Sequence, residues 1–128
     1  MRIVNGAAFL LLTTATPALA TGGFECRPIS GAGPVVSFGI GHLIAARPFA
    51  VTLSEGGQSW STDGENPAIV LGQSWIDGRY LWLDLVDPNL ERFEAQLRAT
   101  FQPRLRDRPA IGTLTRNGRT WRVRCVEA

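Results

Sequence analysis

The sequence predicts a mainly β domain of the α+β class. We expect a small antiparallel β-barrel or sandwich with one helix near residues 88–101 and its ends tied by a disulfide. Short apolar segments alternate with turn residues along most of the chain, as in antiparallel sheets. Asn117-Gly118 has the composition of a tight hairpin turn. Cys26 and Cys125 lie near the two ends of the chain, where one bond would join them.

The first 20 residues have the layout of a cleaved signal peptide. Arg2 supplies a positive charge, residues 3–12 form a mostly apolar run, and Pro17-Ala18-Leu19-Ala20 offers small residues before a cleavage site. The apolar run is about half the roughly 20 residues that span a bilayer. We therefore expect cleavage after Ala20, which leaves residues 21–128 as a single β-rich domain that is not transmembrane.

The basic residues indicate the kind of organism and therefore the compartment. All 13 are arginine and none is lysine, which is typical of a GC-rich bacterial genome. A leader in a bacterium predicts a periplasmic or secreted protein, and two cysteines in an oxidising compartment form a disulfide. A bond between Cys26 and Cys125 would close a loop of about 100 residues, for which the chain-entropy model gives on the order of 4–5 kcal/mol.

Strands account for most of the domain. Six are expected before residue 88, over residues 24–28, 34–40, 49–54, 58–62, 68–75 and 79–86. The third and fourth form a hairpin, because Phe49, Val51 and Leu53 alternate and Glu55-Gly56-Gly57 supplies the turn. The fifth and sixth form a second hairpin across Asp77-Gly78. On the sixth strand the leucines would face the core, at Leu81, Leu83 and Leu85.

The character of the chain changes at Asp87. Asp87 is a good N-cap and Pro88 suits the first helical position, and apolar residues then recur at helical spacing. These signals predict the helix over residues 88–101. The same stretch also alternates strictly between Phe93 and Phe101, as a strand would, so a strand is the alternative. Pro103 ends the element in either case.

The last hairpin is centred on Asn117-Gly118, because both residues tolerate positive φ. Pairing outward from the turn gives an apolar face with the pairs Leu114–Trp121, Gly112–Val123 and Ala110–Cys125. The other face is mostly polar, with the pairs Thr115–Thr120, Thr113–Arg122 and Ile111–Arg124. This register directs Cys125 inward, where Cys26 can meet it.

The sequence contains no motif that carries catalytic chemistry. His42 is the only histidine and lies in a glycine-rich turn, and there is no Gly-x-Ser-x-Gly elbow. The acidic residues lie on turns and strand ends, where they are common for backbone reasons. One histidine with two distant cysteines is too few for a zinc site. We expect no enzymatic activity, no cofactor and no metal.

Positive charge is concentrated in the C-terminal half. Nine arginines lie between Arg92 and Arg124, opposed only by Glu94 and Asp107. Six of them are the predicted anion- or partner-binding surface: Arg104, Arg106, Arg108, Arg119, Arg122 and Arg124. Such a surface would attract a lipopolysaccharide phosphate or a peptidoglycan carboxylate, and the alternative is a solvated face that keeps the protein soluble. The compartment and the net charge of +2 argue against nucleic acid.

Aromatic residues supply a second candidate surface. Four tryptophans are many for this length, and tryptophans on the outer face of a sheet favour contact with carbohydrate or protein. We expect Trp82 to be exposed with Tyr80, because they share a strand face with Asp84. Trp121 is expected to face the core.

The layout resembles the periplasmic C-type lysozyme inhibitor family. The likeness lies in the leader, Phe24-Glu25-Cys26, the short strands, Gly78-Arg79-Tyr80 and the late cysteine. That family places a serine- and glycine-rich loop and a lysine in its partner's active site. This chain has residues 74–80 near one of those places but no lysine, and its helical segment and arginine-rich half also depart from the family. The resemblance therefore assigns no inhibitory residue.

Taken together, these features predict a periplasmic or secreted, non-catalytic binding or envelope-associated domain. Its partner would be an anionic cell-envelope component or a secreted protein. An inhibitor of a secreted enzyme is the alternative function.

Overall fold

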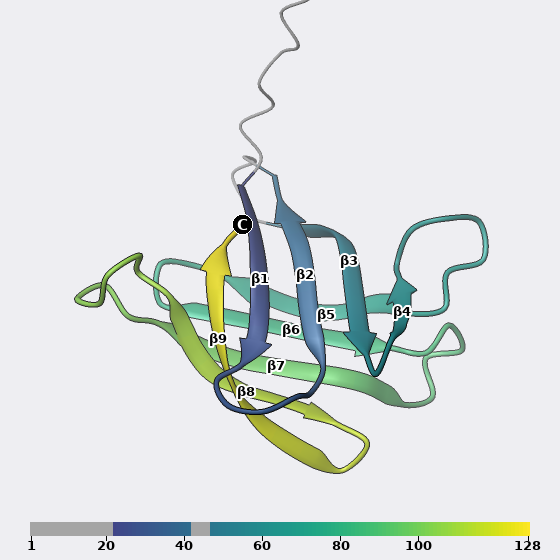
Figure 1. Cartoon of the computed structure of the whole chain (residues 1–128). Coiled ribbons are helices and arrows are strands. Elements are labelled where there is room, and N and C mark those ends of the chain that lie inside the picture. The colour runs from purple at the N-terminus through teal and green to yellow at the C-terminus, as the bar shows by residue number, and fades with distance from the viewer. Residues whose placement is uncertain (1–21, 42–46) are drawn as a thin grey trace, which may run out of the picture.

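The computed structural model describes residues 22–41 and 47–128, which form an antiparallel, nearly closed β-barrel (Figure 1). The expected signal peptide and His42 lie outside the described residues. The strands are β1 (Gly22–Pro28), β2 (Val35–Ile40), β3 (Pro48–Glu55), β4 (Gln58–Ser61), β5 (Val70–Ile76), β6 (Tyr80–Val86), β7 (Phe93–Phe101), β8 (Ala110–Arg116) and β9 (Arg119–Glu127).

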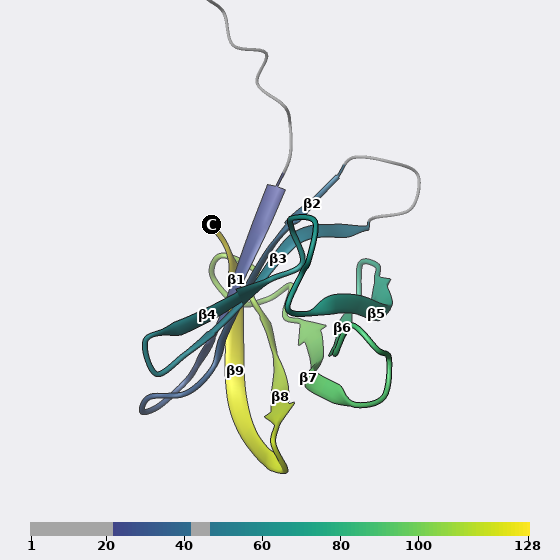
Figure 2. The same cartoon turned by 90° about the vertical axis from the view of Figure 1, so that its right-hand side faces the viewer.

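The strands form one sheet in the order β4-β3-β2-β1-β9-β8-β7-β6-β5. The sheet folds over on itself, so that β1 to β4 cross in front of β5 to β7 (Figure 1). A view from the side shows these two layers, with β8 and β9 connecting them (Figure 2). Strands β4 and β5 are the two ends of the sheet and do not pair with each other, which leaves the barrel incompletely closed.

The core lies between the two layers and is built by alternation along each strand. Its largest fully buried side chains include Leu53, Leu81, Leu83, Leu85, Leu97 and Leu114. The leucines of β6 therefore face inward as expected. Phe24 packs against Phe38 and Phe101, with ring centroids 6.0 Å and 5.8 Å away. Burial of this apolar surface is the main force that holds the layers together.

The hairpin of β8 and β9 confirms the register expected from its turn. Asn117 and Gly118 have φ values of 51° and 73°, which a type I′ turn requires. All six cross-strand pairs expected from the sequence are present, from Thr115–Thr120 to Ala110–Cys125. A two-residue turn that fixes its own geometry thus fixes the pairing of both strands.

The helix predicted over residues 88–101 is wrong, and the alternative strand is present as β7. The Asp87 carboxylate does accept backbone hydrogen bonds, from the N–H groups of Asn89, Glu91 and Arg92 at 3.2, 2.8 and 2.7 Å. These bonds hold a compact loop and do not start a helix. Leu90 has a φ of 58°, which no α-helix allows. Beyond the loop, the inward residues of β7 are Ala95, Leu97 and Ala99.

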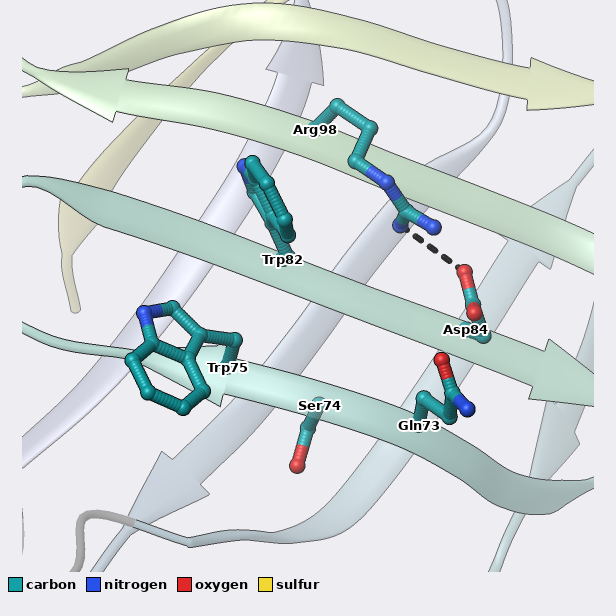
Figure 3. Close-up of a pocket in the computed structure, with 6 residues that line it drawn as sticks. All are labelled: Gln73, Ser74, Trp75, Trp82, Asp84 and Arg98. Atoms are coloured by element: carbon teal, nitrogen blue, oxygen red, sulfur yellow. Dashed lines mark ion pairs between the residues drawn. The ribbon is translucent and has the colours of Figure 1, made fainter.

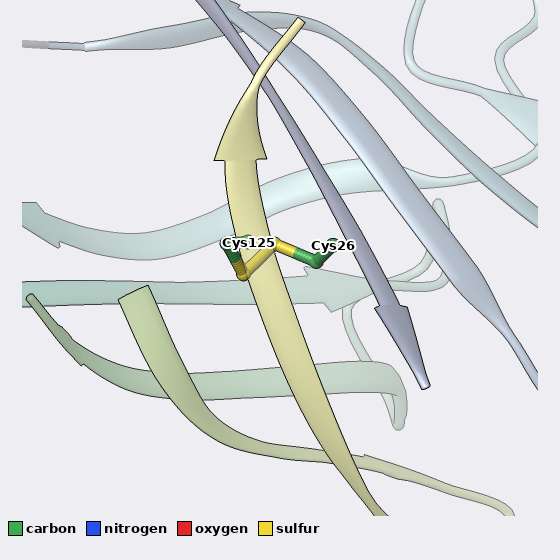
Figure 4. The surroundings of a disulfide bond; sticks show 2 residues. All are labelled: Cys26 and Cys125. Atoms are coloured by element: carbon green, nitrogen blue, oxygen red, sulfur yellow. A yellow bond between two sulfur atoms is a disulfide. The ribbon is translucent and has the colours of Figure 1, made fainter. Parts of the chain in front are cut away.

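The disulfide expected between Cys26 and Cys125 is present (Figure 4). The two cysteines lie directly opposite each other on β1 and β9, and both are fully buried. The bond therefore joins the first and last strands of the domain, 99 residues apart in sequence.

Within the described part of the chain, no helix is long and apolar enough to cross a membrane.

Candidate functional site

The six arginines of the predicted anion surface are divided by the fold. Arg104, Arg106 and Arg108 are all exposed on the loop between β7 and β8. Along β9 the side chains alternate, so Arg119 lies on the face of Trp121 while Arg122 and Arg124 lie on the opposite, outer face. The Arg119 guanidinium is 4.8 Å from the centroid of the Trp121 ring. The sequence grouped these residues correctly on β9, but they do not share one face.

The two exposed tryptophans lie on the outer face of β5 and β6 beside Tyr80, which is half-buried and not exposed as expected. Trp82 is 40% exposed, as expected, and its ring centroid is 5.1 Å from that of Tyr80. Trp75 is more exposed, at 58%, and was not expected there. It lies directly opposite Trp82 in the register of the two strands. Trp60 and Trp121 are partly buried and pack against the core.

A groove of about 350 Å³ lies beside these two tryptophans (Figure 3). Strand β5 contributes Gln73, Ser74 and Trp75, strand β6 contributes Trp82 and Asp84, and β7 contributes Arg98. The register explains the assembly, because Arg98 is opposite Trp82 just as Trp82 is opposite Trp75. We call this outer-face site the tryptophan groove.

The indole ring of Trp75 is held in place by Asp77. Its Nε1–H donates a hydrogen bond of 2.8 Å to Asp77 Oδ2. The other carboxylate oxygen accepts bonds of 2.7 Å from the backbone N–H groups of Arg79 and Tyr80. The backbone bonds from Tyr80 and Arg79, followed by the indole bond, lower the pKa of Asp77 from its ordinary value. The β5–β6 turn thus orients a flat apolar ring at the surface.

The floor of the groove carries a buried carboxylate with its partners. Asp84 is only 4% exposed, and its Oδ1 is 2.8 Å from Nη1 of Arg98. The amide of Gln96 donates a longer bond of 3.4 Å to the same oxygen. Gln73 lies next to Asp84 on the neighbouring strand (Figure 3). A buried charge needs such pairing, and the pair leaves the floor electrically neutral overall.

The Arg98 side chain also fixes the second tryptophan. Its guanidinium carbon is 5.6 Å from the centroid of the Trp82 ring, and Tyr80 contacts the same ring. This cation–π contact and the ion pair with Asp84 restrain both side chains before any ligand arrives. The groove therefore combines two oriented aromatic rings with amide, carboxylate, hydroxyl and guanidinium groups, which suits binding of a ligand with apolar and hydrogen-bonding parts.

Sequence reasoning found part of this site. Alternation with the core leucines predicted the exposure of Trp82. Trp75 was missed because the turn was placed at Asp77-Gly78, whereas the β5–β6 pairing is centred on Gly78-Arg79. Pairing outward from Gly78-Arg79 would have placed Trp75 opposite Trp82. The Asp84–Arg98 pair was also missed, because it depends on β6 and β7 being neighbours.

Metal ligands do not gather in the described ranges, 22–41 and 47–128, where no three His, Cys, Asp or Glu side chains lie close enough to hold an ion.

No protein family model matches this chain, and no curated protein or solved structure is significantly similar to it.

Proposed function

We propose that this protein is a non-catalytic binding domain of the bacterial cell envelope. Its ligand site is the tryptophan groove, and the ligand is a sugar unit of an envelope polysaccharide. The observation that carries this proposal is the pair of exposed tryptophans, Trp75 and Trp82, each held in one orientation on the outer face of the sheet. The buried Cys26–Cys125 disulfide is compatible with the oxidising compartment in which such a ligand occurs.

A sugar ring fits the chemistry of the groove. A pyranose has an apolar face of C–H groups that can lie on an indole ring, and its edge carries hydroxyl groups that need donors and acceptors. The groove supplies both types of hydrogen-bonding group through Gln73, Asp84 and Arg98. Because the Asp84–Arg98 pair is neutral overall, the groove does not require a charged ligand. Fixing both rings in advance also lowers the ordering cost of binding.

The proposal predicts that both tryptophans are needed for full affinity. We would titrate the protein purified from the periplasm with the hexamer of N-acetylglucosamine, a soluble probe with the backbone sugar of peptidoglycan, by isothermal titration calorimetry. W75A and W82A should each weaken binding by about tenfold or more, because each removes one stacking surface.

The matched control is F93A. Phe93 is 58% exposed, like Trp75, but does not line the groove. Loss of affinity in F93A equal to that in W75A, or full affinity in both tryptophan variants, would contradict the proposal. A stoichiometric complex with one secreted enzyme, without any affinity for the sugar, would support the inhibitor function instead.

A further inference from the structure

A second site lies on the outer face of β1 and β9 and goes beyond the groove. Arg27 on β1 and Arg124 on β9 lie directly opposite each other. They directly follow and precede the buried pair Cys26–Cys125, and side chains alternate along a strand, so both arginines point outward. The covalent bond next to them fixes the spacing of the two strands at this point.

The charges at this position are not balanced by the protein itself. Glu25 forms an ion pair with Arg27. In the described part of the chain, neither Arg124 nor Arg122, two residues earlier on the same face, has an acidic partner within ion-pair distance. Three guanidinium groups and one carboxylate leave a local charge of +2 (3 − 1). Like charges directly opposite on paired strands are destabilising, and a bound anion removes this repulsion.

Arg27 and Arg124 line a surface hollow of about 260 Å³. Its lining also includes the Glu25 carboxylate, which pairs with Arg27, and three apolar residues: Pro28 at the end of β1, Ile29 just after it and Val126 on β9. The basic groups would take a small anion, and the apolar walls would contact whatever group the anion is attached to. A phosphate monoester carries about −1.5 to −2 at neutral pH and has three acceptor oxygens, so it matches the local charge and the number of guanidinium groups.

We propose that Arg27, Arg124 and Arg122 form a binding site for the phosphate monoester of an organic ligand. The site is separate from the tryptophan groove in its residues and its chemistry. It does not depend on the sugar proposal, since a ligand can bind either site alone. The same phosphate chemistry occurs on soluble sugar phosphates and on lipid headgroups.

The test measures binding to both sources at low ionic strength, where charge interactions are least screened. Glucose 6-phosphate, with glucose as the neutral counterpart, is titrated while amide and guanidinium resonances are followed by NMR. Phosphatidic acid vesicles, with phosphatidylcholine vesicles as the counterpart, are tested by co-sedimentation. R27Q and R124Q remove one charge each at exposed positions, and R104Q makes the same change on the exposed β7–β8 loop.

We expect at least one phosphate probe to bind and its neutral counterpart not to bind. R27Q and R124Q should each weaken that binding by about tenfold or more, while R104Q changes it by less than about twofold. Binding of glucose 6-phosphate would indicate a site that accepts soluble ligands, and binding of the vesicles alone would indicate a lipid headgroup. Absence of binding to both probes, or equal weakening in all three variants, would overturn the proposal.

Discussion

Asp77 connects the local turn to the candidate site. Its carboxylate accepts hydrogen bonds from two backbone N–H groups of the β5–β6 turn and from the indole N–H of Trp75. One side chain thus closes the turn and orients the most exposed ring of the groove. This arrangement links the geometry of the groove to the ionisation of a single group.

The lowered pKa of Asp77 predicts how the groove responds to acid. A carboxylate with a lower pKa in the folded than in the unfolded state adds stability above the unfolded pKa, and this stability is lost as pH falls through the folded pKa. The Trp75 indole N–H resonance should therefore stay unchanged through the usual aspartate range near pH 3.9 and move only at lower pH. A midpoint at or above that value would contradict this role of Asp77.

Among the elements, β7 shows best where local sequence signals stop being sufficient. Asp87-Pro88 has the same composition as a helix start, because one carboxylate can cap either a helix or a compact loop. The segment forms a strand because it pairs with β6 on one side and β8 on the other, which places Leu97 and its inward neighbours in the core. Local sequence does not contain this tertiary information. Asn117-Gly118, by contrast, sets its own backbone geometry, and its hairpin was predicted in full.

The close approach of β8 to β7 at Gly112 predicts that any side chain at this position destabilises the fold. An added Cβ at this position would lie 1.9 Å from the carbonyl oxygen of Arg98 and 2.5 Å from the Ala99 Cα on β7. Because both are backbone atoms in a paired strand, the sheet itself would have to shift. G112A should cost at least about 3 kcal/mol in the free energy of unfolding, measured by urea denaturation.

The control for this experiment is G22A. Gly22 is the exposed first residue of β1, and no atom lies within 4 Å of where its Cβ would be added. It should change stability by less than about 0.5 kcal/mol. Equal stability of G112A and G22A would show that β7 and β8 do not approach as closely as described.

At the scale of the whole molecule, the disulfide joins the first and last strands of the chain, β1 and β9, which are neighbours in the middle of the sheet. The sequence predicted that the two ends are tied. It could not predict that β1 and β9 are direct neighbours in the sheet, because that depends on how all the intervening strands are ordered. The Arg27–Arg124 pair was hidden for the same reason, since its members are far apart in the chain but opposite in the register.

Reduction of the Cys26–Cys125 bond should lower the free energy of unfolding by on the order of 4–5 kcal/mol, the chain-entropy value for a loop of about 100 residues. Denaturation of the same protein with and without reductant measures this difference. Because the two sulfurs are bonded to each other and leave no free thiol, the protein should also resist alkylation, even when unfolded in denaturant, until it is reduced. Rapid alkylation of both thiols without reductant would contradict a closed bond.

The most direct test of the tryptophan groove uses the four indole N–H resonances of the protein in a single NMR titration with the N-acetylglucosamine hexamer. Trp75 and Trp82 line the groove, whereas Trp60 and Trp121 pack against the core and serve as internal controls. We predict that the resonances of Trp75 and Trp82 shift with a common saturation curve and that the other two stay in place. Shifts confined to Trp60 or Trp121, or no shift at saturating sugar, would contradict the assignment of this groove as the ligand site.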